Sequence, residues 1–244
     1  MYSYTTRVRY SEITQNRVAS LLSIINYFQD CCTFEAEDRG VGIDWLNDHK
    51  TAWMLTSWQI KIDRKPKYCE NIKVTTRACG FRFFVGKRNF TIENADTGEL
   101  LVYAYSEWAY VNVEKGLPEK NVPEEEFEAY GMADPLDKEF EKGRIKLPED
   151  TELIKCEPVT VTDQYLDTNH HVNNGQYIAI AMTALPERFR MNSDKLKSFR
   201  AEYKLQSVKD DVLYPCLAAE QEDKPIVVLK DVDDKVRLIV EFTM

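Results

Sequence analysis

The longest apolar pattern with helical spacing lies near the N-terminus, over residues 17–37. Its apolar residues recur at intervals of three and four, which places them on one face of a helix: Val18, Leu21, Leu22, Ile25 and Phe28. Asn16 is a suitable N-cap, and Gly40 is a typical stop. The pattern therefore predicts one long helix with an apolar face.

After this helix the period of the apolar positions changes to two. Alternating or β-branched and aromatic residues fill the ranges 56–63, 74–94 and 100–113, and the turn sequence ADTGE separates the last two. Such runs, bounded by turn residues, are typical of antiparallel strands joined by hairpins. Residues 114–152 are rich in proline, glycine and charge, so we expect a connecting segment there.

The second half of the chain repeats the order of the first. A strand-like stretch at 158–166 leads into a helical stretch at 175–185, and four more strand-like runs follow: 198–206, 212–221, 226–232 and 236–244. Residues 8–16 can be laid on 161–169 without a gap. Residues 58–63 fall on 199–204, and 90–106 resemble 226–242 in pattern. The order predicts a duplicated α+β unit, one helix and several antiparallel strands in each copy.

Composition narrows the class of protein further. The chain has 244 residues, a net charge of −9 and six cysteines without CxxC spacing. The charge disfavours a nucleic-acid-binding surface, and the cysteines favour reduced thiols over a disulfide framework. Neither a signal peptide nor a long apolar run is evident. We therefore expect a cytoplasmic protein with no membrane span.

Candidate chemistry is concentrated just before the second helix. Asp167, Asn169 and His171 lie at alternate positions, so in extended backbone their side chains would point to one side. Asn173 and Asn174 are typical cap residues, and N–H groups of a first helical turn can hold developing negative charge. A carboxylate or imidazole that takes a proton from water, with N–H donors for an oxyanion, suits ester or thioester hydrolysis.

A plain helix cap with a satisfied histidine is the alternative. The first half bears on this choice, because Thr14, Asn16 and Val18 stand opposite the three candidates. The scaffold is repeated while its ionisable groups are not, which favours one active copy and one degenerate copy.

At these residues the chain resembles the acyl-acyl-carrier-protein thioesterases, a plant-type family with bacterial members. The segment from Asp167 to Asn174, DTNHHVNN, matches the family's D-x-N-x-H-V-N-N pattern. The resemblance implies a tandem hot-dog fold that hydrolyses fatty acyl-carrier thioesters and releases free fatty acid. The expected organisation is an N-terminal unit at 1–113 that holds the acyl chain, a linker at 114–152 and a catalytic unit at 153–244.

One departure from the family lies downstream. Where the family often reads E-Y-R-R-E-C, this chain has Gln206 and Ser207 in place of the acid and the cysteine. A cysteine nucleophile is thereby disfavoured. Gln206 can orient water but cannot take its proton, so we expect Asp167 or His171 to be the base, with Asn169 and Gln206 positioning the water. Backbone N–H groups near Asn173 and Asn174 would hold the oxyanion, without metal or cofactor.

The remaining expectations concern substrate and partner. Apolar residues of the first helix and a strand are candidates for the acyl pocket: Leu21, Leu22, Ile25, Phe28 and Trp58. The implied partner is an acyl carrier protein with an acylated phosphopantetheine arm. Because such carriers are acidic, docking needs a local basic surface. Three clusters qualify: Arg64 and Lys65 with Lys67; Arg82, Lys87 and Arg88; and Arg188, Arg190, Lys195 and Lys197. A homodimer is possible.

Other functions on the same scaffold stay open at this point. One is an acyl-CoA thioesterase, or a hydratase or dehydratase that acts on acyl thioesters. The other is a non-catalytic acyl-binding protein, which the replacement at Gln206 keeps open.

Overall fold

The computed structural model describes residues 1–147, 151–219 and 224–244. The chain divides into two compact units, Met1–Phe140 and Glu141–Met244. No helix in these ranges is long and apolar enough to span a bilayer. Parts of two sequence expectations, the linker at 148–150 and the end of the strand at 212–221, lie outside the described residues.

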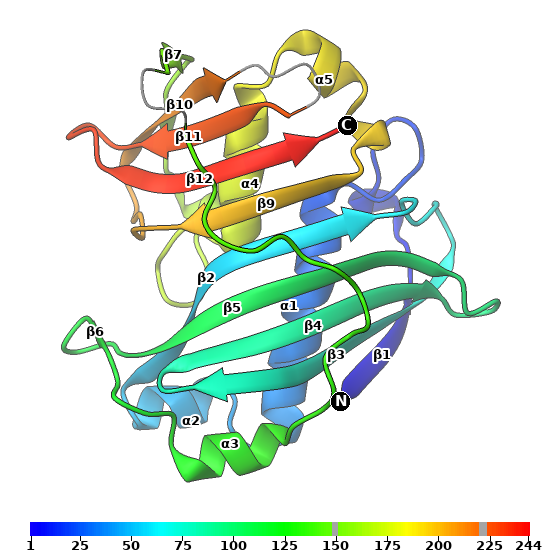
Figure 1. Cartoon of the computed structure of the whole chain (residues 1–244), viewed down its shortest axis with the longest axis vertical. Coiled ribbons are helices and arrows are strands. Elements are labelled where there is room, and N and C mark those ends of the chain that lie inside the picture. Colours follow the sequence, from blue (N-terminus) through cyan, green and yellow to red (C-terminus); the bar gives the residue numbers. More distant parts are fainter. Residues whose placement is uncertain (148–150, 220–223) are drawn as a thin grey trace. The chain divides into compact units, whose positions relative to one another are not determined.

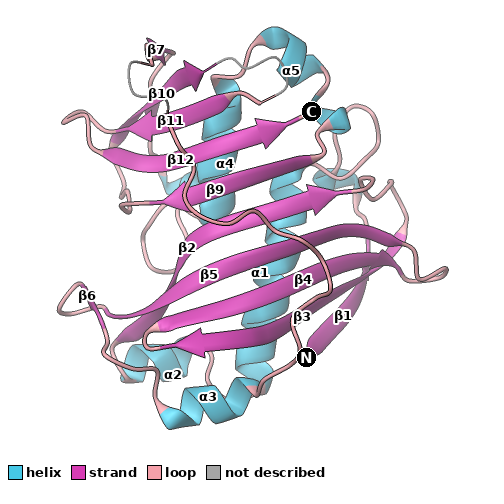
Figure 2. Ribbon diagram, in the orientation of Figure 1, coloured by secondary structure: helices cyan, strands magenta, loops and turns pink. Residues whose placement is uncertain are grey.

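The first unit is an antiparallel sheet with a long helix against one face (Figures 1 and 2). Its strands lie in the order β1, β3, β4, β5, β2, with the short β6 paired to β5. The strand bounds are β1 Tyr2–Arg7, β2 Thr51–Ile62, β3 Asn71–Arg82, β4 Val85–Asn94, β5 Leu100–Asn112 and β6 Leu117–Pro118. Strands β2 to β5 and the turn at 95–99 were expected from the period of two, whereas β1 and β6 were not.

Helix α1 (Leu21–Asp38) begins later than the sequence pattern suggests. Its N-cap is Ser20, whose side chain accepts from the Ser23 N–H, so the expectation that Asn16 caps it is wrong. Residues before Ser20 form a turn closed by a bridge between Ile13 and Ala19. The predicted stop is correct, since Gly40 follows the helix with φ of 77°. Short helices η1 (Tyr10–Glu12), α2 (Ile43–Asp48) and α3 (Glu124–Tyr130) complete the unit.

An aromatic cluster between α1 and the sheet forms the core of the first unit. Phe28 stacks on Trp58 at 5.8 Å between ring centroids, and Phe90 lies 5.1 Å from Phe28 and 5.0 Å from Trp58. All three rings are essentially inaccessible to solvent. Their burial ties the helix to strands β2 and β4, because large aromatic side chains supply much of a core's stabilisation.

The second unit repeats the helix-and-sheet plan. Its strands lie in the order β9, β12, β11, β10, β7, with β8 also paired to β10, and every pair is antiparallel. The bounds are β7 Ile154–Lys155, β8 Val159–Thr160, β9 Ser198–Tyr203, β10 Val212–Ala219, β11 Ile226–Lys230 and β12 Val236–Thr243. The helices are η2 (Asp163–Tyr165), α4 (Asn174–Thr183), α5 (Glu187–Met191) and η3 (Ser193–Lys195).

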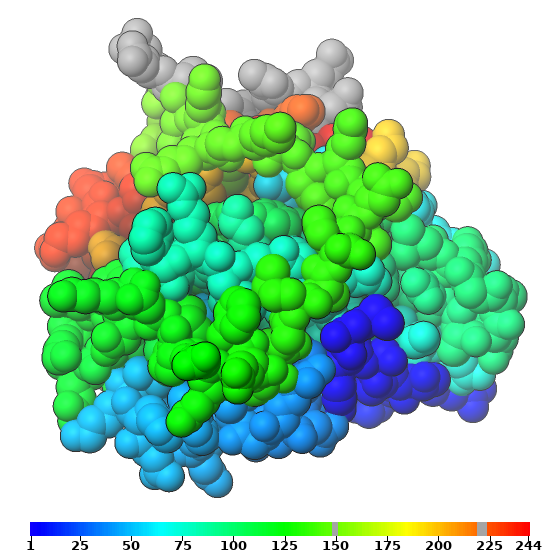
Figure 3. Space-filling model, turned by 60° about the horizontal axis from the view of Figure 1, so that its bottom comes forward, coloured from blue at the N-terminus to red at the C-terminus, as the bar shows by residue number. Residues whose placement is uncertain are grey.

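The expected connection at 114–152 is divided between the two units. Its residues up to Phe140 belong to the first unit, where the Ala133 N–H donates to the Ala78 carbonyl and the Leu136 N–H to Asn89 Oδ1. Figure 3 shows this stretch, in green, spread over the surface. Its many prolines and charges suit such a peptide, which packs on the sheet and joins it only through the two residues of β6. The α+β class, with one main helix and one antiparallel sheet per unit beside shorter helices, is confirmed.

Candidate active site

A tight turn precedes α4 and carries the candidate catalytic residues. A bridge between Leu166 and Val172 closes it. The Asp167 N–H donates to the His171 carbonyl at 2.8 Å, and the His170 N–H donates to the Asp167 carbonyl at 3.1 Å. His170 has φ of 60°, in the left-handed region. The expectation of extended backbone from Asp167 to His171 is therefore wrong, and alternate spacing does not place these side chains on one side.

The turn depends on the side chain of Asp167. Its Oδ1 accepts the Asn169 N–H at 2.8 Å and the His171 N–H at 3.3 Å. This is an Asx turn, in which a carboxylate takes the place of a backbone acceptor. The Asn169 side chain is exposed to solvent. Asp167 thus has a structural role that the sequence argument did not assign to it.

His171 is half-buried, and its ring has an unpartnered nitrogen. Nδ1 is inaccessible to solvent and has no hydrogen-bond partner in the described part of the chain. Buried polar groups almost always have a partner. A histidine held by its backbone, with a buried nitrogen unsatisfied by protein, can bond to a molecule that enters the site. Of the predicted residues, His171 has the surroundings that best suit proton transfer.

The N-terminus of α4 is largely occupied by its own cap. Asn173 is the N-cap, and its Oδ1 accepts the Gly175 N–H at 2.9 Å. The Asn173 N–H itself donates to the Tyr165 carbonyl at 2.8 Å. The Asn173 N–H is therefore not open to an oxyanion in this structure, and of the two predicted donors only Asn174 is kept as a candidate.

The downstream segment that departs from the family pattern lies directly against the turn. The Ser207 carbonyl accepts the Val172 N–H at 2.9 Å, next to His171. The Ser207 side chain is fully buried and its Oγ has no hydrogen-bond partner among the residues described. Gln206 is exposed, and its carbonyl accepts from Arg237. The structure therefore brings 206–207 beside 171–172, as the resemblance implies.

Two tyrosines next to this segment were missed by the sequence argument. Tyr177, in the second turn of α4, is buried and lies beside Ser207 without a well-aligned hydrogen bond; burial raises the pKa of its phenol. Tyr203 stands edge-on to Tyr177 and donates to the Asn174 carbonyl at 2.9 Å. Burial also raises the pKa of Tyr203. Both phenols stay protonated, so they act as hydrogen-bond groups and not as bases.

The first unit contains the same turn with different side chains. The Thr14 N–H donates to the Val18 carbonyl at 2.8 Å, the Arg17 N–H donates to the Thr14 carbonyl at 3.0 Å, and Arg17 has φ of 59°. Thr14 Oγ1 accepts the Asn16 N–H at 3.3 Å, as Asp167 accepts that of Asn169. The ungapped match of 8–16 to 161–169 is therefore reproduced in hydrogen bonds.

The predicted acyl-pocket residues lie in the core between α1 and its sheet. Leu21, Ile25, Phe28 and Trp58 are buried, whereas Leu22 is only partly buried. The Trp58 indole Nε1 is buried and has no hydrogen-bond partner among the residues described. Their packing is that of an ordinary core, and a role in holding an acyl chain stays a prediction.

A buried charged pair deeper along α1 was not expected. Glu35 is inaccessible to solvent; its Oε2 accepts Arg88 Nη1 at 2.6 Å, and its Oε1 accepts Arg39 Nη2 at 3.0 Å. Arg88 also donates to Thr76 Oγ1 at 3.0 Å and lies 4.5 Å from the Tyr130 ring centroid. The signal was present, since Glu35 continues the apolar stripe of α1 at helical spacing and Arg88 shares a strand face with Phe90.

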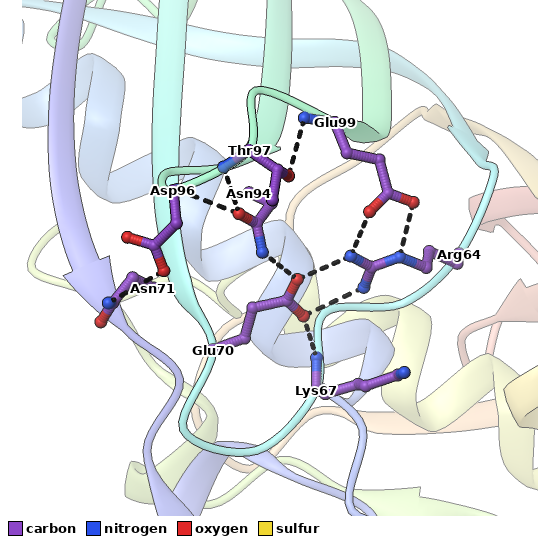
Figure 4. A network of polar contacts seen from close by, with 8 residues as sticks. All are labelled: Arg64, Lys67, Glu70, Asn71, Asn94, Asp96, Thr97 and Glu99. Atoms are coloured by element: carbon purple, nitrogen blue, oxygen red, sulfur yellow. Dashed lines mark hydrogen bonds and ion pairs between the residues drawn. The ribbon is translucent and has the colours of Figure 1, made fainter.

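The basic clusters proposed for docking differ in availability. Arg64 is held by Glu70 at 2.7 Å and by Glu99 at 2.6 Å (Figure 4). Burial would raise the pKa of Glu70, but hydrogen bonds from Arg64, the Lys67 N–H and Asn94 hold it at about 2. Its ion pairs make Arg64, and burial makes Arg88, poorly available for docking. The side chains of Lys67, Arg190 and Lys197 are exposed.

The described ranges contain no group of three His, Cys, Asp or Glu side chains placed to hold a metal ion. All six cysteines have free thiols.

Comparison with known proteins gives a consistent family. A model described as the acyl-ACP thioesterase N-terminal domain matches residues 1–130, and one described as the C-terminal domain matches 148–236. Chloroplastic palmitoyl-acyl carrier protein thioesterases are similar: that of Gossypium hirsutum is 26% identical over 87% of this chain, and that of Arabidopsis thaliana 27% over 84%. The chain spans about half the length of these relatives, 54% and 52%.

Solved structures agree in fold. The crystal structure of an acyl-ACP thioesterase from Bacteroides thetaiotaomicron superposes with a TM-score of 0.85 and 23% identity, covering 99% of this chain and 96% of that one. The 12:0-ACP thioesterase from Umbellularia californica gives 0.84 and 19% identity, over 99% and 96%. The tandem hot-dog fold implied by the family resemblance is thereby confirmed.

Proposed function

Because the chain belongs to the acyl-ACP thioesterase family, we propose that it hydrolyses fatty acyl-carrier thioesters, with the site ahead of α4 as its active site. The products are a free fatty acid and the carrier's thiol. The observation that carries the proposal is the buried, unpartnered Nδ1 of His171 on a turn fixed by Asp167 and lying against residues 206–207.

In the proposed mechanism, the His171 imidazole takes a proton from water while the water oxygen attacks the thioester carbonyl carbon. Asn169 and Gln206, whose side chains are exposed beside the turn, position the water. Hydrogen-bond donors at Asn174 hold the oxyanion of the tetrahedral intermediate. The intermediate collapses, the carbon–sulfur bond breaks, and the thiolate receives the proton that His171 holds. No cofactor takes part.

Asp167 fixes the histidine's backbone and supplies negative charge beside it. Its Oδ1 is occupied by two N–H groups, so only Oδ2 is left for chemistry. We therefore assign the base role to His171 and a positioning role to Asp167. The first unit, with its apolar core between α1 and the sheet, is proposed to lodge the acyl chain.

The test is hydrolysis of palmitoyl-carrier protein, followed by thiol release. We expect His171→Ala to lower kcat/KM by roughly 100-fold or more, the usual contribution of a general base. Asp167→Asn keeps an Oδ1 acceptor for the turn, so it should leave the melting temperature unchanged while lowering kcat. If both variants stay within about threefold of wild type, the assignment of the base is wrong.

The same assay separates the alternative functions. An acyl-CoA thioesterase would turn over palmitoyl-CoA at least as well as palmitoyl-carrier protein. A non-catalytic acyl-binding protein would release no thiol above background. The cytoplasmic location stays a prediction, because the curated relatives are named as chloroplastic.

A further inference from the structure

Exposed cationic and aromatic side chains gather on the first unit, around the turn that corresponds to the catalytic one. They come from the end of β1, from η1, from the turn itself and from the segment before β3: Arg7, Tyr10, Arg17, Lys67 and Tyr68. We refer to these five as the basic–aromatic surface. Figure 3 shows the N-terminal segment, in dark blue, at the molecular surface.

Direct contacts join these residues into one surface. The Tyr10 and Tyr68 rings meet edge to face at 6.1 Å between centroids. The Tyr68 N–H donates to the Arg17 carbonyl at 2.8 Å, and a bridge pairs Val18 with Lys67. Arg7 Nε donates to the Cys69 carbonyl at 3.0 Å, which anchors it beside Tyr68.

The positive charge of this surface is not neutralised by its surroundings. Arg7, Arg17 and Lys67 form no ion pair within the described part of the chain. The nearby acids have other partners: Glu12 binds Arg9 and the Tyr27 hydroxyl, and Glu70 and Glu99 bind Arg64. Three cations therefore face solvent in a protein with a net charge of −9. Tyr10 is 80% exposed and Tyr68 43% exposed, which is unusual for such large rings.

The second unit shows that folding does not require these side chains. Its matching positions hold Thr160, Asp163, His170, Val208 and Lys209. Where the first unit has the Tyr10–Tyr68 contact, the second has an ion pair between Asp163 and Lys209 at 2.8 Å. The turns have the same backbone–backbone hydrogen bonds, and a left-handed residue at the same position, in both units. The fold that the two units share therefore does not require the positive charge and the exposed rings of the first unit.

We propose that the basic–aromatic surface docks the acidic carrier protein that brings the acyl thioester. This inference rests on the proposed function. Arginines and tyrosines are enriched at protein interfaces, where they pair with carboxylates and cover apolar side chains. Complementary charge also raises the rate of encounter. The net charge of −9 repels an acidic partner from the rest of the chain, so such a partner is guided to this local positive surface.

The test replaces the three cations by glutamate, Arg7→Glu, Arg17→Glu and Lys67→Glu, in the full chain. For palmitoyl-carrier protein we expect KM to rise by about tenfold or more with kcat nearly unchanged, because docking and not chemistry is affected. The wild type should lose affinity as salt is raised, and the variant should lose that dependence. Hydrolysis of an acyl-N-acetylcysteamine, which lacks both carrier and phosphate, should be unaffected.

A matched control variant replaces three other exposed cations by glutamate, which changes the net charge by the same amount. Arg188→Glu, Arg190→Glu and Lys197→Glu alter the exposed cations around α5 and after it. If this control raises KM as much as the first variant, the effect is not specific to the basic–aromatic surface and the docking proposal is overturned. An unchanged KM in the first variant overturns it too.

A separate measurement keeps docking distinct from catalysis. Binding of fluorescently labelled holo-carrier protein, without an acyl chain, is followed by anisotropy. If wild type hydrolyses no thioester yet binds carrier through the three cations, the proposed function fails and the docking surface stands. If it hydrolyses palmitoyl-carrier protein and the triple variant binds carrier equally well, the docking surface fails and the function stands. Stronger competition by RNA than by carrier would also overturn the assignment of the partner.

Discussion

A single carboxylate, that of Glu35, illustrates what one buried charge requires. It lies on the apolar face of α1 with no exposure to solvent, and both of its oxygens are paired, one with Arg88 and one with Arg39. Removing water from a carboxylate costs several kcal/mol unless partners replace it. The buried pair need not stabilise the fold as a whole, but removing one partner leaves the other charge buried and unpaired, which is destabilising.

We expect Arg88→Met to lower the free energy of unfolding by about 3 kcal/mol, because it leaves Glu35 buried with Arg39 alone. Chemical denaturation would measure the loss. The neighbouring Lys87→Met is the control, since Lys87 and Glu107 are 3.6 Å apart and both substantially exposed; it should cost less than about 1 kcal/mol. Equal losses in the two variants would contradict the argument, as would a Glu35→Met/Arg88→Met double variant less stable than Arg88→Met.

At the scale of an element, α3 carries a second buried carboxyl, Glu126. It is inaccessible to solvent, its Oε2 accepts the Trp53 Nε1–H at 3.2 Å, and its Oε1 has no partner among the residues described. Burial raises the pKa of Glu126 to about 7, although the Trp53 hydrogen bond and the charges of Arg88 and His49 act against the rise. The short helix therefore packs best with this carboxyl protonated.

Because the folded pKa lies above the ordinary value of 4.5, folded protein keeps the Glu126 proton in a range where unfolded protein has lost it. The contribution of Glu126 to stability is fully present below pH 4.5 and declines as the pH rises to about 7. We expect this decline to amount to about 3 kcal/mol relative to Glu126→Gln, which cannot titrate. Unfolding free energies of both proteins at pH 5 and pH 8 would measure it. If the difference in unfolding free energy between wild type and Glu126→Gln is the same at pH 5 and pH 8, Glu126 does not titrate in this range.

Elements were easier to predict from sequence than the geometry of the site. The period of two predicted strands β2 to β5 but not β1 or β6, and the apolar stripe predicted α1, because both patterns follow from which face is buried. The start of α1 was predicted too early because Val18 lies at helical spacing from Leu21 and Leu22. In the structure, hydrogen bonds between Thr14, Arg17 and Val18 close a turn there instead. The matching turn in the second unit explains why the prediction of extended backbone at Asp167 was wrong. The left-handed backbone at His170 turns the chain there, and the sequence pattern did not indicate it.

At the scale of the whole molecule, duplication separates what the fold needs from what the chemistry needs. The turns ahead of α1 and α4 share their hydrogen bonds, yet only the second carries Asp167 and His171. The surroundings differ as well: opposite Ser207 and Tyr177 the first unit has Pro66 and Ile24. The side chains of the turn are therefore one part of the site, and the neighbouring segment and helix supply the rest.

This division predicts the outcome of transplanting the motif. Thr14→Asp with Val18→His gives the first turn the D-x-N-x-H pattern, since Asn16 is already in place. We expect the free energy of unfolding of the double variant to lie within about 1 kcal/mol of that of the wild type. Asp offers the acceptor that Thr14 Oγ1 provides, and Val18 is only partly buried. In a His171→Ala background it should leave hydrolysis of palmitoyl-carrier protein at the His171→Ala level. Recovery of thiol release would show that the turn alone suffices and that residues 206–207 and Tyr177 are dispensable.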